Sequence, residues 1–296
     1  MQGFLNRPLT ARDITVRPAW LSDRAAMDRL TEHSHRLHFN LDWWSFDQWL
    51  HPAEPSEAIW LAFDRQDLIG LWAAPFEQSP VVWLRALAIA NGYSADPIFT
   101  ALFSQARAAL QRQGAEQVVI LAHPQWVNDL TQRQSFDLYN RIITLRKNDR
   151  DVPDLVHPPA AAIRPARAED IAAITENDRA SFDTIWWHSA ASLEYILKVV
   201  AHFVVAESDG RVVGHAFCDV YGGHGHLIRL VVHPRYQRRG IGEQLLNESL
   251  LYQVQVGAYP LTLNTQLDNT ASQALYRRYG YVPTGQPVQV MQCRLS

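Results

Sequence analysis

The sequence predicts an α/β protein made of two tandem domains of one fold, each a mixed sheet flanked by helices. Its 296 residues exceed the roughly 100–150 of a typical single domain, and 47% of them are hydrophobic, enough for two cores. Two stretches, TVRPAWLSDRAAM (15–27) and AIRPARAEDIAAI (162–174), align on Arg-Pro-Ala, an acidic residue and an Ala-Ala pair, which indicates an internal duplication. In the second copy, strands joined by a tight turn precede a strand–helix–strand order. That order is typical of a three-layer α/β domain and not of a doubly wound sheet.

The duplication also sets the expected domain boundaries. Further segments align at nearly the same offset: Trp43-Trp44 with Trp186-Trp187, 59–73 with 203–217, and 99–110 with 242–253. Between the copies, the stretch NDRDVPDLVHPPA (148–160) contains three prolines, which withhold the N–H donors that strands and helices need. We therefore predict a first domain over 12–147, a linker over 148–160 and a second domain over 161–296.

Local patterns predict the first elements of the second copy. The Arg-Pro pair starts a short strand, and the acidic residues after it start a helix, because carboxylates are favoured at the positive end of the helix dipole. A Trp-rich helical segment follows. Ser208-Asp209-Gly210 then predicts a hairpin turn, because Asp-Gly between β-branched runs is a strong signal for a two-residue turn.

The rest of the second copy alternates strands and helices. Pro234 ends an apolar strand over 227–232, because proline cannot continue a strand ladder. Gly280 is expected to end the helix before the last strand, as glycine does at helix C-termini. The predicted elements after the first strand are a helix over 242–255, a strand over 260–267, a helix over 269–280 and a strand over 287–295.

Composition excludes several classes of protein. The formal net charge of −3 gives no general field for nucleic acid or for anionic membrane, so any anion site must be local. Two cysteines are too few for a disulfide framework and lack metal-ligand spacing. The sequence shows no signal-like apolar segment at its start and no apolar run of about 20 residues. We expect a soluble cytoplasmic protein with no metal, no membrane association and no nucleic-acid partner.

The stretch HPRYQRRGIGEQLL (233–246) predicts an anion site. It leaves a strand and starts a helix, where backbone N–H groups lack intrahelical partners and the dipole adds positive potential. Gly240 and Gly242 permit positive φ and close approach of a bulky anion such as phosphate. The alternative is a solvated basic helix start. The loop is neither a Walker loop nor a GxGxxG turn.

In this position the loop resembles the fingerprint of the GNAT superfamily of acetyl-CoA-dependent N-acetyltransferases, Gln/Arg-x-x-Gly-x-Gly/Ala. DNTASQALYRRYGY (268–281) resembles the family's second segment, with Tyr281 in place of the usual Phe. The motifs place the resemblance in residues 160–296. It extends to the first copy, residues 12–147, only because that copy aligns with the second. It implies that acetyl-CoA is the co-substrate, that loop amides bind its pyrophosphate, and that a mostly antiparallel sheet carries the site. The implied cofactor-binding residues are Leu230, Val231 and Val232 beside the pantetheine, and Gln237, Arg238, Arg239, Gly240, Ile241 and Gly242 in the loop.

The resemblance also implies catalytic residues. Tyr276 matches the tyrosine that protonates the leaving thiolate, although its helical spacing also fits a buried core residue. Asn269 is expected either to contact the cofactor or simply to cap the helix. The base is often a carboxylate eleven residues before the fingerprint, and here that position is His226, which can accept a proton at neutral pH. Nearby alternatives to His226 are His224, Tyr221 and Asp219, and a polar turn explains the histidines equally well.

The first copy lacks both motifs. Residues 94–99 lie over the fingerprint, with Asp96 in place of a cation and Pro97 in place of an amide donor. Thr131 and Ser135 lie at the positions of Tyr276 and Gly280. We therefore predict a non-catalytic first domain, an arrangement that resembles tandem-GNAT proteins such as mycothiol synthase.

The expected activity is transfer of an acetyl group to a primary amine by direct attack, catalysed by the second domain. The acceptor is a small molecule or a peptide, and the protein is a monomer or a homodimer. One alternative is a non-catalytic acyl-CoA sensor. Another is a protein or peptide N-acetyltransferase whose first domain docks the acceptor.

Overall fold

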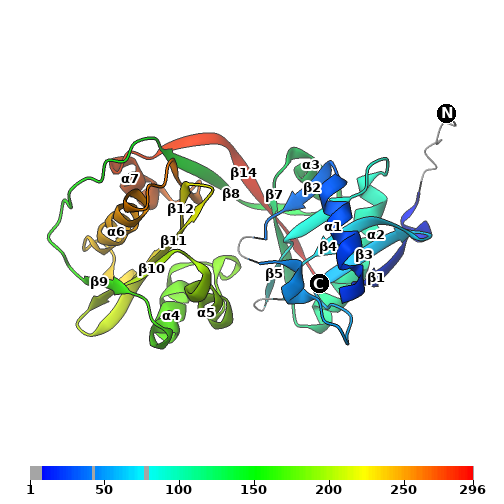
Figure 1. The fold of residues 1–296 in the computed structure, drawn as a ribbon, viewed down its shortest axis with the longest axis horizontal. Coiled ribbons are helices and arrows are strands. Elements are labelled where there is room, and N and C mark those ends of the chain that lie inside the picture. The colour runs from blue at the N-terminus through cyan, green and yellow to red at the C-terminus, as the bar shows by residue number, and fades with distance from the viewer. Residues whose placement is uncertain (1–8, 42–43, 77–79, 296) are drawn as a thin grey trace. The chain divides into compact units, whose positions relative to one another are not determined.

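A computed structural model describes residues 9–41, 44–76 and 80–295 and divides the chain into two compact units. Unit 1 comprises residues 1–139 with 289–296, and unit 2 comprises residues 140–288. Each is a mixed α/β unit with its own hydrophobic core (Figure 1). No helix in the described part of the chain is long and apolar enough to cross a lipid bilayer.

This division differs from the expected one because two strands continue from one unit into the other. Strand β8 (Asp137–Lys147) pairs antiparallel with β13 (Leu261–Gln266) of unit 2. The last part of β14 (Val282–Arg294) pairs antiparallel with β7 (Gln117–Ala122) of unit 1. The final strand of each sequence copy is therefore part of the other unit. The sequence pattern of a strand is the same whichever sheet receives it, so the repeat alone does not reveal this exchange.

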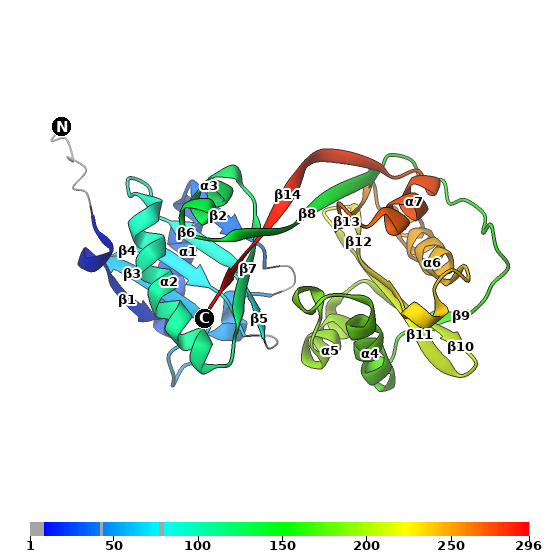
Figure 2. The same cartoon turned by 180° about the vertical axis from the view of Figure 1, so that it is seen from behind.

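Unit 2 is built around a sheet with the order β14-β8-β13-β12-β11-β10-β9. Its strands not yet given are β9 (Ala162–Pro165), β10 (His202–Ser208), β11 (Arg211–Tyr221) and β12 (His224–Val232). Its helices are α4 (Ile171–Ser181), α5 (Ala190–Val199), α6 (Ile241–Gln255) and α7 (Thr270–Arg278), with short 3₁₀ turns η4 (Ala168–Asp170), η5 (Thr184–Trp186) and η6 (Pro234–Tyr236). Helices α4 and α5 cover one face of the sheet, and α6 and α7 cover the other (Figures 1 and 2).

Local chemistry explains the turns of unit 2. Asp209 and Gly210 join β10 to β11 with φ of 51° and 71°, as a two-residue primed turn requires, so the predicted hairpin is confirmed. Gly280 has φ of 81° directly after α7 and ends that helix as expected. Strand β12 begins at His224, three residues earlier than predicted, so His226 lies within a strand and not in a turn.

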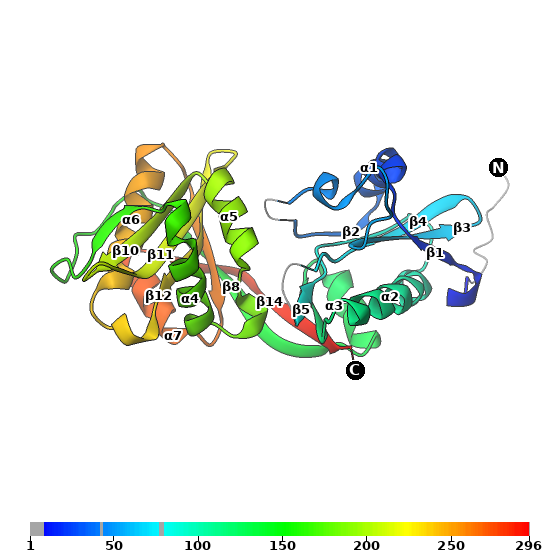
Figure 3. The ribbon, with the colours of Figure 1, turned by 90° about the horizontal axis from the view of Figure 1, so that it is seen from below.

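Unit 1 has a similar order of elements, with strands β2 and β5 added and no α-helix matching α5, around a sheet with the order β1-β3-β4-β6-β2. Its strands are β1 (Thr15–Pro18), β2 (Arg36–Phe39), β3 (Ile59–Asp64), β4 (Asp67–Ala73), β5 (Val81–Trp83) and β6 (Ala86–Ile89), with β5 pairing parallel to β7. Its helices are α1 (Arg24–His33), α2 (Ala95–Arg112) and α3 (Gln125–Arg133), with 3₁₀ turns η1 (Ala11–Asp13), η2 (Leu21–Asp23) and η3 (Phe46–Trp49). Helix α1 lies on one side of this sheet and α2 on the other (Figure 3).

One matched ion pair supports the repeat in three dimensions. In unit 1, Arg17 donates to both carboxylate oxygens of Asp23, at 2.7 and 2.8 Å. In unit 2, Arg164 donates to both oxygens of Asp170, each at 2.8 Å. Both arginines belong to the Arg-Pro pairs that align in the sequence. Trp43 lies outside the described residues.

Candidate active site

The site of unit 2 begins where two neighbouring strands separate. Strands β12 and β13 pair in parallel only over residues 225–227 and 261–263. Beyond that point β12 pairs with β11 alone, and β13 continues to pair with β8. Backbone groups on the facing edges of β12 and β13 are therefore left without partners in the ladder.

A cavity of about 440 Å³ lies at this opening. Its walls are residues 227–232 of β12, residues 264–266 of β13, the start of α7 and the loop before α6. Phe182 and Trp186, from the segment between α4 and α5, close the remaining side. The cavity thus combines apolar side chains with strand edges, as small-molecule sites generally do.

The basic loop at one end of this cavity has the geometry of an anion site. Arg238 and Gly240 have φ of 62° and 83°, and Gly240 is the N-cap of α6. Positive φ in such a turn directs successive N–H groups toward one point, where the helix dipole adds to their potential. Gln237 is held by a 2.9 Å hydrogen bond from its Nε2 to the carbonyl of Val232.

The predicted cofactor-binding residues divide into two groups. Those that line the cavity are Leu230, Val231, Val232, Gln237, Arg238, Gly242, Asn269 and Tyr276. Arg239, Gly240 and Ile241 do not line it. Arg239 donates to the carbonyl of Arg235, Ile241 is buried in the core, and Gly240 shapes the turn.

The predicted linker is not an open connection, because its second half lies along α6. We call residues 153–161 the strap. The buried carboxylate of Glu243 accepts from the Val156 N–H at 3.2 Å and contacts His157 Nδ1 at 3.0 Å. Gln244 accepts the N–H of Ala160 at 2.8 Å. The strap therefore packs beside the anion loop.

We expect Glu243→Gln to loosen the strap and lower the free energy of unfolding by about 1–3 kcal/mol, because it weakens charge-assisted hydrogen bonds in a buried place. Burial raises the pKa of Glu243, but the hydrogen bonds with His157 and Val156 lower it by more, and the net pKa lies below 4.5. The contribution of Glu243 to the free energy of unfolding is thus present at neutral pH and is lost as the pH falls through 4.5 and below. Chemical denaturation and amide exchange of the strap measure it.

Glu248→Gln is the matched control, since Glu248 lies on the same helix and is 40% exposed, 3.6 Å from His202. Its loss is expected to change stability by less than about 1 kcal/mol. Equal effects of the two substitutions, or unchanged exchange in the strap, would contradict the role of Glu243.

Tyr276, on α7, is one of the residues that line the cavity. It is only 6% exposed, and burial raises its pKa to about 12, with a hydrogen bond to Ser272 acting in the opposite direction. The hydroxyl is therefore protonated at neutral pH. The neighbouring Tyr281, with ring centroids 6.1 Å apart, is buried in the core and does not line the cavity.

Asn269 serves as the N-cap of α7. Its side-chain oxygen accepts the Ser272 N–H at 3.2 Å, which accounts for the residue type without any ligand. It also lines the cavity, so capping places its amide beside the space that a ligand would occupy.

His226, the expected base, is not brought to the cavity. It lies in the paired part of β12, where its Nδ1 is 2.8 Å from the hydroxyl of Thr262. Burial lowers its pKa below 6.5. Among the described residues that line the cavity, the ionisable side chains are those of Arg229, Arg238 and Tyr276.

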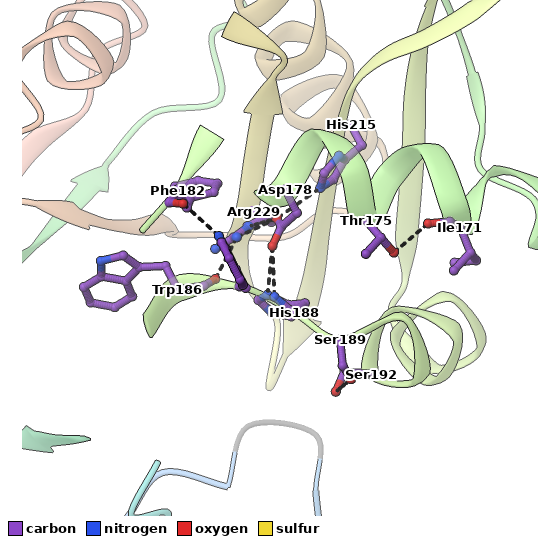
Figure 4. Close-up of polar contacts among 11 residues, drawn as sticks. Ile171, Thr175, Asp178, Phe182, Trp186, His188, Ser189, Ser192, His215 and Arg229 are labelled. Atoms are coloured by element: carbon purple, nitrogen blue, oxygen red, sulfur yellow. Dashed lines mark hydrogen bonds and ion pairs between the residues drawn. The ribbon is translucent and has the colours of Figure 1, made fainter. Parts of the chain in front are cut away.

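Sequence reasoning missed a buried polar cluster on the α4 side of the cavity. Arg229 donates through Nε and Nη2 to Asp178 at 2.8 and 2.5 Å, and the backbone N–H of His188 donates to the same carboxylate at 2.9 Å (Figure 4). Asp178 and His215 are fully buried, and burial together with the charge of Arg229 lowers the pKa of His215 to about 3. His215 is therefore neutral. These residues are up to 51 positions apart, so no local pattern announces them.

The corresponding place in unit 1 has different chemistry. Helix α2 begins at Ala95, with Asp96 and Pro97 in its first turn. Arg133 donates to both oxygens of Asp96, at 2.9 and 3.1 Å. Ser135 has a positive φ of 60° after α3, and Gly280 has one of 81° after α7, so the two helices end in the same left-handed conformation.

A family model and curated proteins match part of this chain. The model of the acetyltransferase (GNAT) family matches residues 169–281. The chain is 31% identical over 121 residues to an uncharacterized N-acetyltransferase of Methanocaldococcus jannaschii, which covers 40% of this chain and 76% of that protein. It is 27% identical over 125 residues to a Bacillus subtilis protein named "Putative ribosomal protein bS18-alanine N-acetyltransferase", with 42% and 83% covered.

Solved structures share the fold over nearly the whole chain. A GCN5-related N-acetyltransferase from Sphaerobacter thermophilus has a TM-score of 0.65 at 15% identity, with 97% of both chains covered. A tandem GNAT protein from the clavulanic acid biosynthesis pathway has a TM-score of 0.65 at 14% identity, with 96% of this chain and 99% of that chain covered.

The family match and the named relatives define an acyltransferase of the class that uses an acyl-CoA donor and an amine acceptor. The chain belongs to the GNAT family of acetyltransferases. The predicted α/β architecture of two GNAT-like domains in tandem is confirmed.

Proposed function

We propose that unit 2 binds acetyl-CoA and transfers its acetyl group to a primary amine by direct attack. The observation that carries this proposal is the cavity between β12 and β13, which meets the positive-φ loop at the start of α6. The loop amides, with Arg238, would bind the pyrophosphate, and the free edge of β12 at residues 230–232 would pair with the pantetheine. The donor set therefore fits acetyl-CoA.

The reaction requires that the protein hold the amine next to the thioester and supply a proton to the leaving sulfur. Acetyl-CoA supplies an activated acetyl group as a thioester. The amine nitrogen forms a bond to the acetyl carbon while the carbon–sulfur bond breaks, the amine loses a proton, and the sulfur gains one. Tyr276, protonated and at the cavity wall, is the proposed donor of that second proton.

The acceptor must reach the site as a neutral amine, and the described cavity offers no carboxylate or histidine to deprotonate it. Amines of lower pKa are neutral in a larger fraction at pH 7, and an α-amino group titrates near 7.7–8.0 against about 10.4 for lysine. The role of His226 as base stays a prediction, and its place in β12 does not support it. The B. subtilis relative is named for acetylating an alanine, which favours a peptide α-amine as one acceptor to test.

The proposal is tested by release of free thiol from acetyl-CoA with four amines: an alanine-initiated peptide, the same peptide with a blocked N-terminus and a free lysine, glucosamine, and alaninamide. We expect turnover with at least one amine and formation of its N-acetyl product, measured by mass spectrometry. Tight acetyl-CoA binding without any turnover would favour the sensor alternative instead. Failure to bind acetyl-CoA by calorimetry would refute the proposal.

A further inference from the structure

The side of the cavity opposite Tyr276 contains one cation whose hydrogen bonds are incompletely used. Arg229 projects from β12 toward α4, on the face of the sheet that α4 and α5 cover. Tyr276 belongs to α7, on the other face. Because a thioester bound along β12 would pass between these faces, Arg229 lies where the amine acceptor would approach.

The three nitrogens of the Arg229 guanidinium differ in their hydrogen bonds. Nε and Nη2 donate to Asp178, and Nη2 also donates to the carbonyl of Trp186 at 2.8 Å. No hydrogen bond of Nη1 to a described residue is present, and Nη1 is not among the fully buried atoms that lack a partner, so it is accessible on a side chain that is 9% exposed and lines the cavity. A ligand oxygen in the cavity can therefore accept a hydrogen bond from Nη1 without displacing a protein partner.

The guanidinium is fixed before any ligand arrives. It stacks on the ring of Phe182 at 3.8 Å, and the carboxylate that orients it is held by the backbone N–H of His188. The neutral His215 lies 3.7 Å from the same carboxylate and adds no charge to the Arg229–Asp178 pair. An arginine already paired with a carboxylate, with a spare donor pair, suits a polar oxygen such as a carbonyl, without requiring a full anion.

We propose that Arg229 is an acceptor-binding residue whose Nη1 group donates to a carbonyl oxygen next to the reacting amine. The acceptor class is then an α-amino carbonyl compound, such as a peptide N-terminus or an amino-acid amide. This inference rests on the proposed function, since it places the acceptor relative to acetyl-CoA in unit 2.

The test compares alaninamide with isopropylamine, which keeps the branched carbon and the amine but has a methyl group in place of the carbonyl. With the unmodified protein, we expect kcat/KM per neutral amine to be at least about tenfold higher for alaninamide. Trialanine and free alanine, assayed in the same way, distinguish a peptide from a free amino acid, and acetylation of either supports the proposal. Equal efficiencies for alaninamide and isopropylamine would overturn it without any substitution.

The Arg229→Lys variant extends the test, because a single ammonium does not reproduce the planar fork that donates to Asp178, Trp186 and a ligand oxygen in fixed directions. We expect a loss of about 10- to 100-fold in kcat/KM for alaninamide, carried mainly by KM, and a loss at least fivefold smaller for isopropylamine. Arg164→Lys is the matched control, because it alters a similar Arg–Asp pair at the start of α4, away from the cavity. It should leave kcat/KM unchanged for both alaninamide and isopropylamine. Calorimetry with acetyl-CoA shows whether the cofactor site of Arg229→Lys is intact.

The outcomes separate the two proposals. Equal losses for both amines in Arg229→Lys would make Arg229 a structural residue and overturn this inference. Acetylation of isopropylamine without preference for alaninamide overturns the inference and leaves the proposed function intact. Failure of the unmodified protein to bind acetyl-CoA overturns the proposed function itself.

Discussion

Gly240→Asp is expected to weaken acetyl-CoA binding by about 10- to 100-fold. Gly240 has φ of 83°, which costs a residue with a side chain roughly 1–2 kcal/mol. A Cβ at this position would lie 3.2 Å from the Cβ of His157 in the strap. The new carboxylate would also stand at the helix N-terminus where the pyrophosphate needs donors, at a cost of about 1.5–3 kcal/mol for lost charged hydrogen bonds. The backbone strain lowers the stability of the free and the bound protein alike, so the lost hydrogen bonds alone determine the change in Kd, about 10- to 100-fold.

Calorimetric titration with acetyl-CoA measures this effect, and Gly257→Asp is its control. Gly257 lies at the other end of α6 with φ of 77° and open space around its Cβ position. The control has the same backbone strain and the same added charge but lies away from the cavity, so its affinity should stay within about twofold of the unmodified protein. Unchanged affinity in Gly240→Asp would show that the loop does not bind the diphosphate.

Features that depend on a few neighbouring residues could be predicted from the sequence. Asp209-Gly210 determines its turn by backbone conformation alone, and Gly240, with φ of 83°, marks the strand-to-helix loop in the same way. Gly242 lies within α6 and does not have the positive φ that its type permits. The second motif was predictable for a related reason: Asn269 caps the N-terminus of α7, and Gly280, with a positive φ, follows its C-terminus. Each of these signals acts within one turn of the chain.

Features that depend on distant partners were not predictable. Nothing local tells whether β14 pairs within its own copy or with β7, since both choices bury the same apolar residues. The Asp178–Arg229 pair joins positions 51 residues apart. One signal was present: an arginine inside the apolar strand 227–232 requires a buried partner, and its presence there could have directed attention to an acidic residue on α4.

The first domain as a non-catalytic copy stays a prediction, but the structure gives it a physical basis. The carboxylate of Asp96 stands in the first turn of α2, and its hydrogen bonds from Arg133 lower its pKa, so it is ionised at neutral pH. Pro97 withholds one N–H from the same turn. A diphosphate at this helix start would meet negative charge and one donor fewer than at α6.

Tyr276→Phe is expected to lower kcat by about 10²- to 10⁴-fold while KM for acetyl-CoA changes little, because a general acid acts on the leaving sulfur and not on binding. With its pKa raised to about 12, the hydroxyl keeps its proton throughout the range in which the protein is assayed. Deprotonation of Tyr276 should therefore not lower kcat between pH 7 and about 10, and any fall in this range should appear equally in Tyr276→Phe. Steady-state kinetics across this range, with whichever amine is acetylated, measures both effects.

Tyr281→Phe is the control that separates catalysis from packing. Tyr281 is 1% exposed, lies against Tyr276, and its hydroxyl has no hydrogen-bond partner among the described residues. Removing that hydroxyl deletes the same atom from the same cluster without touching the cavity, so kcat should remain within about threefold and stability should hold or rise, because an unsatisfied buried polar group is lost. If both substitutions lower kcat alike, Tyr276 acts through packing of the α6–α7 face. If neither does, water protonates the thiolate and the tyrosine belongs to the core alone.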